Sequence, residues 1–152
     1  MKSKKVILFI VEGVTDKNSL SLILSKLISN SHIRFHIVGG DITTNQNTTI
    51  QNCIIKVNDE IKKFLSISKF KKNDILEVVH LVDTDGVYIK DEFVKLDSTN
   101  NIIYKSDCML TDKVELTIKR NRKKASILDK LSTNTTSAKE SLAPLAGFNS
   151  FP

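Results

Sequence analysis

The sequence lacks any apolar run close to the length of a membrane-spanning helix. Of its 152 residues, 40% are hydrophobic and 26% are charged, whereas a helix needs about 20 consecutive apolar residues to cross a bilayer. The N-terminal stretch 1–5 is basic and precedes an apolar run, but Glu12 and Asp16 interrupt the sequence and no small-residue cleavage site follows. This excludes a signal peptide. We therefore expect a cytoplasmic protein with a real hydrophobic core.

Cysteine and histidine are also scarce. Cys53 and Cys108 are the two cysteines and are far apart, without a Cys-x-x-Cys pattern, so we expect free thiols in a reducing compartment. His32 and His36 flank an apolar stretch, and neither has a Cys or His partner at zinc spacing. His80 stands inside an apolar run, where a packed core histidine is the favoured interpretation. No internal repeat is present.

Basic residues are in excess. The 23 Lys and Arg against 17 Asp and Glu give a net charge of +6, which permits nucleic-acid binding without establishing it. Lys outnumbers Arg, and Asn and Ile are abundant, which suggests an AT-rich bacterial or phage genome. The run 119–124 is a candidate clamp for a polyanion, and its alternative is a solvated helix face or linker. The clamp residues are Lys119, Arg120, Arg122, Lys123 and Lys124.

Apolar runs alternate with helical stripes in the first half of the chain. The runs predict strands at 6–11, 33–38 and 75–82. One helix is expected from about Thr15 to Asn30, with the stripe Leu20, Ile23, Leu24, Leu27 and Ile28. A second helix, capped at Thr48 or Thr49, carries the stripe Ile50, Cys53, Ile54, Val57, Ile61, Phe64 and Leu65. The order strand, helix, strand, helix, strand predicts a parallel sheet with right-handed crossovers.

The second half of the chain has weaker patterns. A short helix is expected within 88–96 and a strand at 101–105, while 114–118 fits either a strand or a helix. The basic run leads into a helix that carries Ile127, and no period survives from residue 132 onward. We therefore expect an α/β domain at 1–106, a basic helical extension at 107–131 and a loose or truncated tail at 132–152.

Carboxylates stand where two of the predicted strands end. Asp83 and Asp85 follow the third strand, and Glu12 follows the first. Alternation along an extended chain would point Asp83 and Asp85 the same way. Two such carboxylates repel each other unless a cation lies between them, so the pattern indicates a Mg²⁺ or Mn²⁺ site. The alternative is a solvated Asp-x-Asp-Gly turn.

These motifs resemble those of a known family. The segment Val11-Glu12-Gly13-Val14-Thr15-Asp16 after an apolar strand resembles the first motif of Toprim domains. The segment Val82-Asp83-Thr84-Asp85-Gly86 resembles their Asp-x-Asp motif, and the resemblance covers roughly residues 4–106. The Thr-Asp that follows the Glu-Gly is most similar to the nuclease and maturase branches, such as overcoming-lysogenization-defect nucleases. The resemblance implies a three-layer α/β fold of about four mainly parallel strands, with helices on both faces.

The resemblance also implies a function, Mg²⁺-dependent phosphodiester chemistry on DNA or RNA, with a nuclease favoured. Glu12 would be the general acid/base or a metal ligand, and Asp83 and Asp85 would hold Mg²⁺ or Mn²⁺. Asp16 would be a second-site ligand or a support for Glu12, and Gly13 would let the backbone approach the phosphate. A partner protein or a homo-oligomer would complete the substrate site, and the nuclease branch implies a defence role in phage or mobile-element conflict.

Two other functions fit the same residues. Some Toprim domains are non-catalytic and bind nucleic acid or recruit partners. The segment from Val82 to Val87 also resembles the opening motif of haloacid-dehalogenase-type phosphatases, in which Asp83 would be the nucleophile and Asp85 the acid/base. That family begins its core with this strand, whereas eighty residues precede it here. Replacement of Glu12 distinguishes the phosphatase from the Toprim chemistry.

Overall fold

The computed structural model describes residues 5–28, 32–98 and 100–133. The predicted helix end near Asn30 and nearly all of the segment 132–152 lie outside these ranges. Within them, no helix is both long and apolar enough to cross a membrane.

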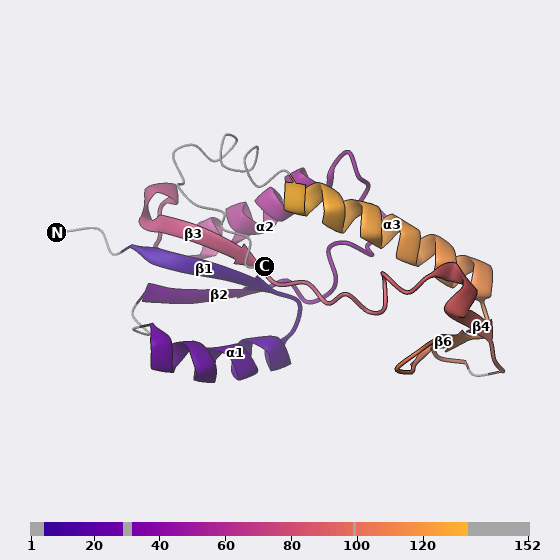
Figure 1. Ribbon diagram of the computed structural model, residues 1–152. Coiled ribbons are helices and arrows are strands. Elements are labelled where there is room, and N and C mark those ends of the chain that lie inside the picture. Colours follow the sequence, from indigo (N-terminus) through magenta and orange to yellow (C-terminus); the bar gives the residue numbers. More distant parts are fainter. Residues whose placement is uncertain (1–4, 29–31, 99, 134–152) are drawn as a thin grey trace.

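Three parallel strands form the main sheet (Figure 1): β1 (Val6–Val11), β2 (Ile33–Ile37) and β3 (Ile75–His80). Their order is β2-β1-β3, so the first strand is central and pairs with both others. The predicted parallel arrangement is confirmed for these three strands. A four-stranded sheet is not, because the remaining strands form a separate sheet.

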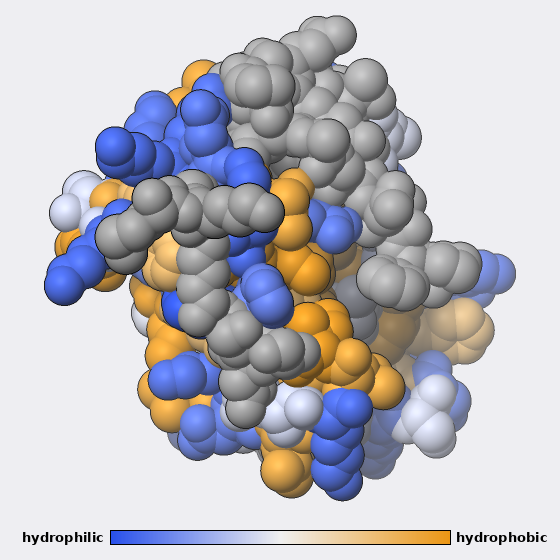
Figure 2. All heavy atoms as spheres, turned by 90° about the vertical axis from the view of Figure 1, so that its left-hand side faces the viewer, coloured by the Kyte–Doolittle hydropathy of each residue, from blue (hydrophilic) through white to orange (hydrophobic). Residues whose placement is uncertain are grey.

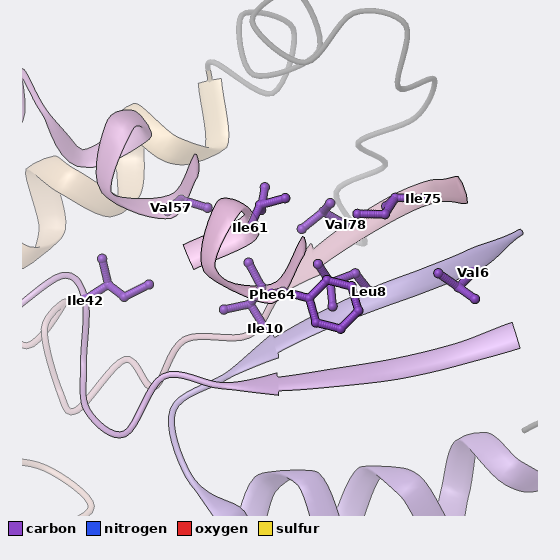
Figure 3. Packing of buried hydrophobic residues seen from close by; sticks show 9 residues of the cluster. All are labelled: Val6, Leu8, Ile10, Ile42, Val57, Ile61, Phe64, Ile75 and Val78. Atoms are coloured by element: carbon purple, nitrogen blue, oxygen red, sulfur yellow. The ribbon is translucent and has the colours of Figure 1, made fainter. Parts of the chain in front are cut away.

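Two helices cover the two faces of this sheet (Figure 1). On one side, α2 (Cys53–Ile67) buries Val57, Ile61 and Phe64 against β1 and β3, as Figure 3 shows. On the other side, α1 (Val14–Leu27) packs Leu20 and Leu24 against a smaller cluster around Phe9 and Val11. Successive β1 side chains alternate between the two clusters, which is why all but one of its residues are buried.

The helix boundaries and stripes differ in part from the expectation. The second helix starts at Cys53 rather than Ile50, because Thr49 and Asn52 first close a turn in which Asn52 N donates to Thr49 O at 3.2 Å. In α1, Ile23 and Leu27 of the predicted stripe are exposed. The face that α1 turns to the sheet is therefore narrower than its apolar residues suggest.

The second half of the chain builds a small mixed sheet and one long helix. The strands are β4 (Val94–Leu96), β5 (Ile103–Tyr104) and β6 (Met109–Thr111), in the order β4-β6-β5. Where a short helix was expected within 88–96, a 3-10 turn, η3 (Asp91–Phe93), leads directly into β4. A second 3-10 turn, η2 (Lys72–Asp74), precedes β3.

The long helix resolves the ambiguity at 114–118 in favour of a helix. It is α3 (Val114–Thr133), and it takes in the basic run as well as Ile127. Figure 1 shows α3 extending from the small sheet back to the side of the main sheet that carries α2. Leu131, near its C-terminal end, packs against the core cluster under α2. One helix thus connects the two sheets.

The two ends of the main sheet differ in character. Figure 2 views the molecule from the edge at which the strands begin, and hydrophobic and hydrophilic side chains are intermingled on the part of this face that is visible. The strands end at the opposite edge, toward α3 and the small sheet (Figure 1). Ligands of parallel α/β sheets bind beyond the carboxyl ends of the strands, and the acidic residues of interest follow those ends.

Candidate active site

The three strands of the main sheet each lead into an acidic residue. Glu12 follows β1, Asp41 follows β2 after two glycines, and Asp83 follows β3. Pairing continues past the strand ends, since Gly39 N donates to Glu12 O at 3.2 Å and Leu81 N donates to Ile10 O at 3.0 Å. The first and third strands lie side by side. Glu12 therefore stands on the central strand, between the two segments that carry the other acids.

A lysine from α3 lies between two of the carboxylates. The Lys124 side chain is 1% exposed, and its Nζ lies 2.7 Å from Asp41 Oδ2 and 3.0 Å from Asp85 Oδ2. Burial acts to lower the pKa of Lys124, but the hydrogen bonds to the two carboxylates outweigh it and raise that pKa. The edge of the main sheet at which Glu12, Asp41, Asp83 and Asp85 follow the strand ends is called the acidic edge below. Lys124 is a permanent positive charge within it.

Asp41 is held by several donors. Its Oδ1 accepts from Thr43 N at 2.6 Å, from Thr43 Oγ1 at 2.5 Å and from Thr44 N at 3.3 Å, while its Oδ2 accepts from Lys124. Burial would raise its pKa, but the bonds to Lys124 and Thr43 prevail and lower that pKa to about 2. Asp41 is thus a fixed anion at neutral pH, and Thr43, itself fully buried, orients it.

Glu12 behaves in the opposite way. Burial, followed by the charges of Asp41 and Asp83, raises its pKa to about 7, although Lys124 acts to lower it. Its Oε1 is buried and has no hydrogen-bond partner among the described residues. A carboxyl group with this pKa exchanges its proton near neutral pH, as a general acid or base must. Asp41 and Asp83 therefore lie close enough to Glu12 for their charges to act on it.

His80 lies beside this group. His80 on β3 pairs with Ile10 on β1. Ile10 is two residues before Glu12, so the side chains of His80, Ile10 and Glu12 belong to the same face of the sheet. Its Nε2 is buried without a hydrogen-bond partner among the described residues. Burial lowers the pKa of His80 to about 4, against the opposing charge of Asp41, so the ring is neutral at pH 7. The histidine expected in the core is thus half-buried, with its Nε2 enclosed, and it borders the acidic edge.

Asp16 and Gly13 form the start of α1. Gly13 N donates to Asp16 Oδ2 at 2.9 Å, so Asp16 caps the helix and supports the loop that carries Glu12. A Cβ added at Gly13 would lie 3.5 Å from Asp16 Oδ2, an ordinary contact. The fold therefore does not itself require glycine at position 13. A ligand role for Asp16 and a phosphate contact at Gly13 stay predictions.

Asp83 and Asp85 do not follow a regular extended alternation. β3 ends at His80, and Asp85 has a φ of 44°, in the left-handed region, followed by Gly86 with a φ of 66°. Both aspartates are exposed, and Asp85 uses its Oδ2 to bind Lys124. Of these two aspartates, Asp83 is the one whose charge raises the pKa of Glu12.

The basic run is distributed around α3 rather than gathered on one surface. Lys124 is buried in the acidic edge, Arg120 Nη2 lies 3.5 Å from Asp85 O, and Arg122 pairs with Asp91. Lys123 Nζ donates to Asn45 O at 3.0 Å, and Lys119 is exposed. Six consecutive helical residues point in all directions. The structure thus places Lys124 and Arg120 next to the acids, and Lys119, Arg122 and Lys123 farther round the helix.

Sequence reasoning missed two members of the site, Asp41 as an anion and Lys124 as its partner. A signal for Asp41 was present, because Gly39-Gly40-Asp41 follows a predicted strand directly. The signal for Lys124 lies in helical spacing. Thr117, Asn121 and Lys124 are all buried on one stripe of α3, where an amphipathic helix usually carries apolar residues. A polar stripe of this kind indicates a helix that faces a polar site.

The acidic edge has the carboxylate oxygens that a divalent ion prefers as ligands, but the residues that the structure describes do not surround an ion with a complete set of protein ligands. Within residues 5–28, 32–98 and 100–133, no three His, Cys, Asp or Glu side chains are arranged to hold a metal ion together. Lys124 occupies the space between Asp41 and Asp85. Glu12, with its unpartnered oxygen, and Asp83 remain. Mg²⁺ commonly takes one or two carboxylates and completes its shell with water and substrate phosphate, so this pair fits it.

Comparison of the chain with protein-family models, with curated proteins and with solved structures finds no match. Membership of the Toprim family therefore stays a prediction that rests on the Glu-Gly and Asp-x-Asp motifs. The function has to be argued from the arrangement of the acidic edge.

Proposed function

We propose that the protein carries out Mg²⁺-dependent phosphodiester cleavage on nucleic acid. The observation that supports this most is the position of Glu12, Asp41 and Asp83 after the carboxyl ends of three neighbouring parallel strands, where burial and the charges of Asp41 and Asp83 raise the pKa of Glu12. Acids so placed could hold a divalent cation, which would offset the negative charge that develops on phosphoryl oxygens. The basic residues Arg120 and Lys119 on α3 are available to attract the polyanion.

Each residue of the site would have a separate role in this reaction. Glu12 and Asp83 would hold Mg²⁺, which when bound offsets charge on the phosphoryl and leaving oxygens. Alternatively, with Glu12 not bound to the ion, its carboxyl would exchange a proton with water near neutral pH, as a general acid or base. Lys124 offsets one of the two negative charges of Asp41 and Asp85, which lowers the repulsion among the four acids at this edge. His80 stays neutral and adds no charge.

The test is cleavage of supercoiled plasmid, single-stranded DNA and RNA with Mg²⁺, with Mn²⁺ and with EDTA. We expect metal-dependent cleavage by the wild type, and a loss of at least about a hundredfold in Glu12→Gln and Asp83→Asn, since each removes a charged group at the reacting centre. Asp59→Asn is the matched control, because Asp59 pairs with Lys62 on the surface of α2, away from the strand ends. Equal cleavage by Asp83→Asn and wild type would contradict the proposal and indicate a contaminant.

A second function, a non-catalytic nucleic-acid-binding module, is favoured by one observation. Lys124 already provides the positive charge between Asp41 and Asp85, so these two carboxylates are stable without an ion. Tight nucleic-acid binding without cleavage in either metal would support this module. A phosphatase of the haloacid-dehalogenase type would instead hydrolyse p-nitrophenyl phosphate, and that activity would survive Glu12→Gln.

A further inference from the structure

An exposed tyrosine of the small sheet borders the turn that carries the acids. Tyr104, on β5, is 47% exposed. A Cβ placed on Gly86 would meet Tyr104 Cδ1 at 3.3 Å, so the edge of the ring lies directly against the Asp85-Gly86 turn. This contact links two segments from different sheets. An aromatic ring thus stands at the rim of the acidic edge with nearly half of its surface free.

Arg120 fixes the tip of this ring. Its Nη2 lies 3.3 Å from Tyr104 Oη and 3.5 Å from Asp85 O, so one guanidinium bridges the tyrosine and the acid turn. The guanidinium is anchored in turn by Asn121, whose Oδ1 accepts from Arg120 Nη2 at 2.9 Å. Asn121 is buried, and its Nδ2 lies 3.3 Å from Met109 Sδ, on the strand that pairs with β5. The ring and the guanidinium therefore form one pre-organised unit.

The remaining donors of Arg120 face no described partner. Its hydrogen bonds to residues within the described ranges all use Nε and Nη2. The guanidinium carries five N–H groups, so Nη1 keeps its donors for a ligand. A half-exposed tyrosine and a spare cationic donor suit single-stranded nucleic acid, because bases stack on aromatic rings and their phosphates bind arginine.

We propose that Tyr104 and Arg120 form a nucleotide subsite beside the Asp85-Gly86 turn, in which Tyr104 stacks an unpaired base and Arg120 binds the adjoining phosphate. The substrate class is then single-stranded nucleic acid, because the faces of bases inside a duplex are already stacked on their neighbours. This inference rests on the proposed function for its biological sense, but the subsite can be tested without cleavage.

A second exposed tyrosine serves as an internal control. Tyr88 is 61% exposed, more than Tyr104, but its Oη lies 3.4 Å from the carboxylate oxygen Oδ1 of Asp129. The hydroxyl of Tyr88 is thus bonded to a carboxylate, whereas that of Tyr104 is bonded to a guanidinium that can bind phosphate, so Tyr88 should not bind nucleic acid despite its exposure. The two tyrosines therefore separate a general effect of losing a surface aromatic from a specific effect at the acidic edge.

The experiment measures binding by fluorescence anisotropy in EDTA, where metal-dependent cleavage is absent. The probes are a labelled 12-nucleotide single-stranded DNA, the RNA of the same sequence, and the corresponding blunt duplex. We expect Tyr104→Leu, which keeps an apolar side chain against Gly86, to weaken binding of at least one single strand about tenfold. Tyr104→Phe should bind like the wild type, and Tyr88→Leu likewise. Duplex binding should change less than about threefold.

Two results would overturn the subsite: equal single-strand binding by Tyr104→Leu and wild type, or an equal loss on single strand and duplex. Thermal melts of each variant establish that the protein is folded. A dependence on Tyr104 that appears with DNA alone or with RNA alone assigns the sugar and supports the subsite. The same binding measured in Asp83→Asn separates the two proposals. If Tyr104→Leu weakens single-strand binding in the Asp83→Asn background, and the wild-type protein cleaves none of the substrates, then the subsite is supported and the nuclease proposal is wrong.

Discussion

Glu12 differs from the other acids of the edge because of where the fold puts it. On the central strand it is surrounded by Asp41 and Asp83, and part of its carboxyl is buried without a partner. Asp41 has the same side-chain chemistry but receives Lys124 and Thr43 as donors. The two carboxyl groups consequently titrate in opposite directions from their ordinary values. One site thus contains both a fixed anion and a proton-exchanging acid.

This raised pKa predicts a pH-dependent stability. The pKa of Glu12 is 4.5 when unperturbed and about 7 in the fold. The protonated Glu12 therefore contributes to the free energy of unfolding below pH 4.5, and this contribution is lost as the pH rises through 7. Glu12→Gln should therefore gain stability relative to the wild type between pH 5 and pH 8. After discounting for solvent screening we expect about 1 kcal/mol. Urea unfolding at both pH values measures it.

The control for this measurement is Glu92→Gln, at an exposed glutamate of η3. Its difference from the wild type should be the same at pH 5 and pH 8. A Glu12→Gln variant whose stability relative to the wild type does not change with pH would show that Glu12 ionises normally in the fold.

At the scale of elements, the Asp85-Gly86 turn decides the geometry of the acids. The chain leaves β3 and enters the left-handed region at two consecutive residues, with φ of 44° at Asp85 and 66° at Gly86. This conformation brings Asp85 back toward Lys124, where a simple extension of the strand would not. The Asp-x-Asp-Gly pattern is consistent with a turn and with a charged site. The structure contains the turn, and this turn brings the Asp85 carboxylate to Lys124.

We predict that Gly86→Ala destabilises the protein by about 1–3 kcal/mol, because the positive φ is strained for a side chain. The new Cβ would also meet Ile89 Cδ1 at 3.0 Å and Met109 Sδ at 3.2 Å. Chemical denaturation measures the change. Gly13→Ala is the matched control, since Gly13 has an ordinary φ of −136° and a nearest contact of 3.5 Å. Similar losses in the two variants would refute the argument.

The elements with strong periodicity were the ones that the sequence predicted well. The strand at 6–11 has the predicted bounds, and the second helix is present although it begins at Cys53, because most of the strand is buried and the helix carries a clear apolar stripe. In contrast, β4, β5 and β6 have only two or three residues each, too few for a period to show. The helix at 114–118 was ambiguous because its buried stripe is polar, so that hydrophobic spacing carried little information.

At the scale of the whole molecule, α3 makes the candidate site depend on both halves of the chain. Lys124 binds Asp41 and Asp85, Ile127 is fully buried, and Leu131 packs against the core under α2. The expected division after residue 106 would separate these groups from the main sheet. The division itself stays a prediction, but the contacts of α3 argue that the first part needs the second.

A fragment of residues 1–106 should therefore unfold without a cooperative transition, since it exposes the apolar surface that α3 covers and removes the counter-charge of Asp41. Urea denaturation followed by circular dichroism measures this. Full-length Lys124→Met removes the charge alone and should keep a cooperative transition, weakened by about 3 kcal/mol. A fragment as stable as the full chain would show that α3 is an independent extension.

The sequence by itself determined the alternation of strands and helices and the acids at the strand ends. These features are local, because period, capping residues and turn residues act within a few positions of one another. The tertiary structure alone decided that Asp41 and Lys124 join those acids and that Glu12 titrates near neutral pH. Both outcomes depend on residues that are far apart in the sequence, such as Asp41 and Lys124 with a separation of 83, coming together at a partly buried site, where the energy of a charge is set by its neighbours in space.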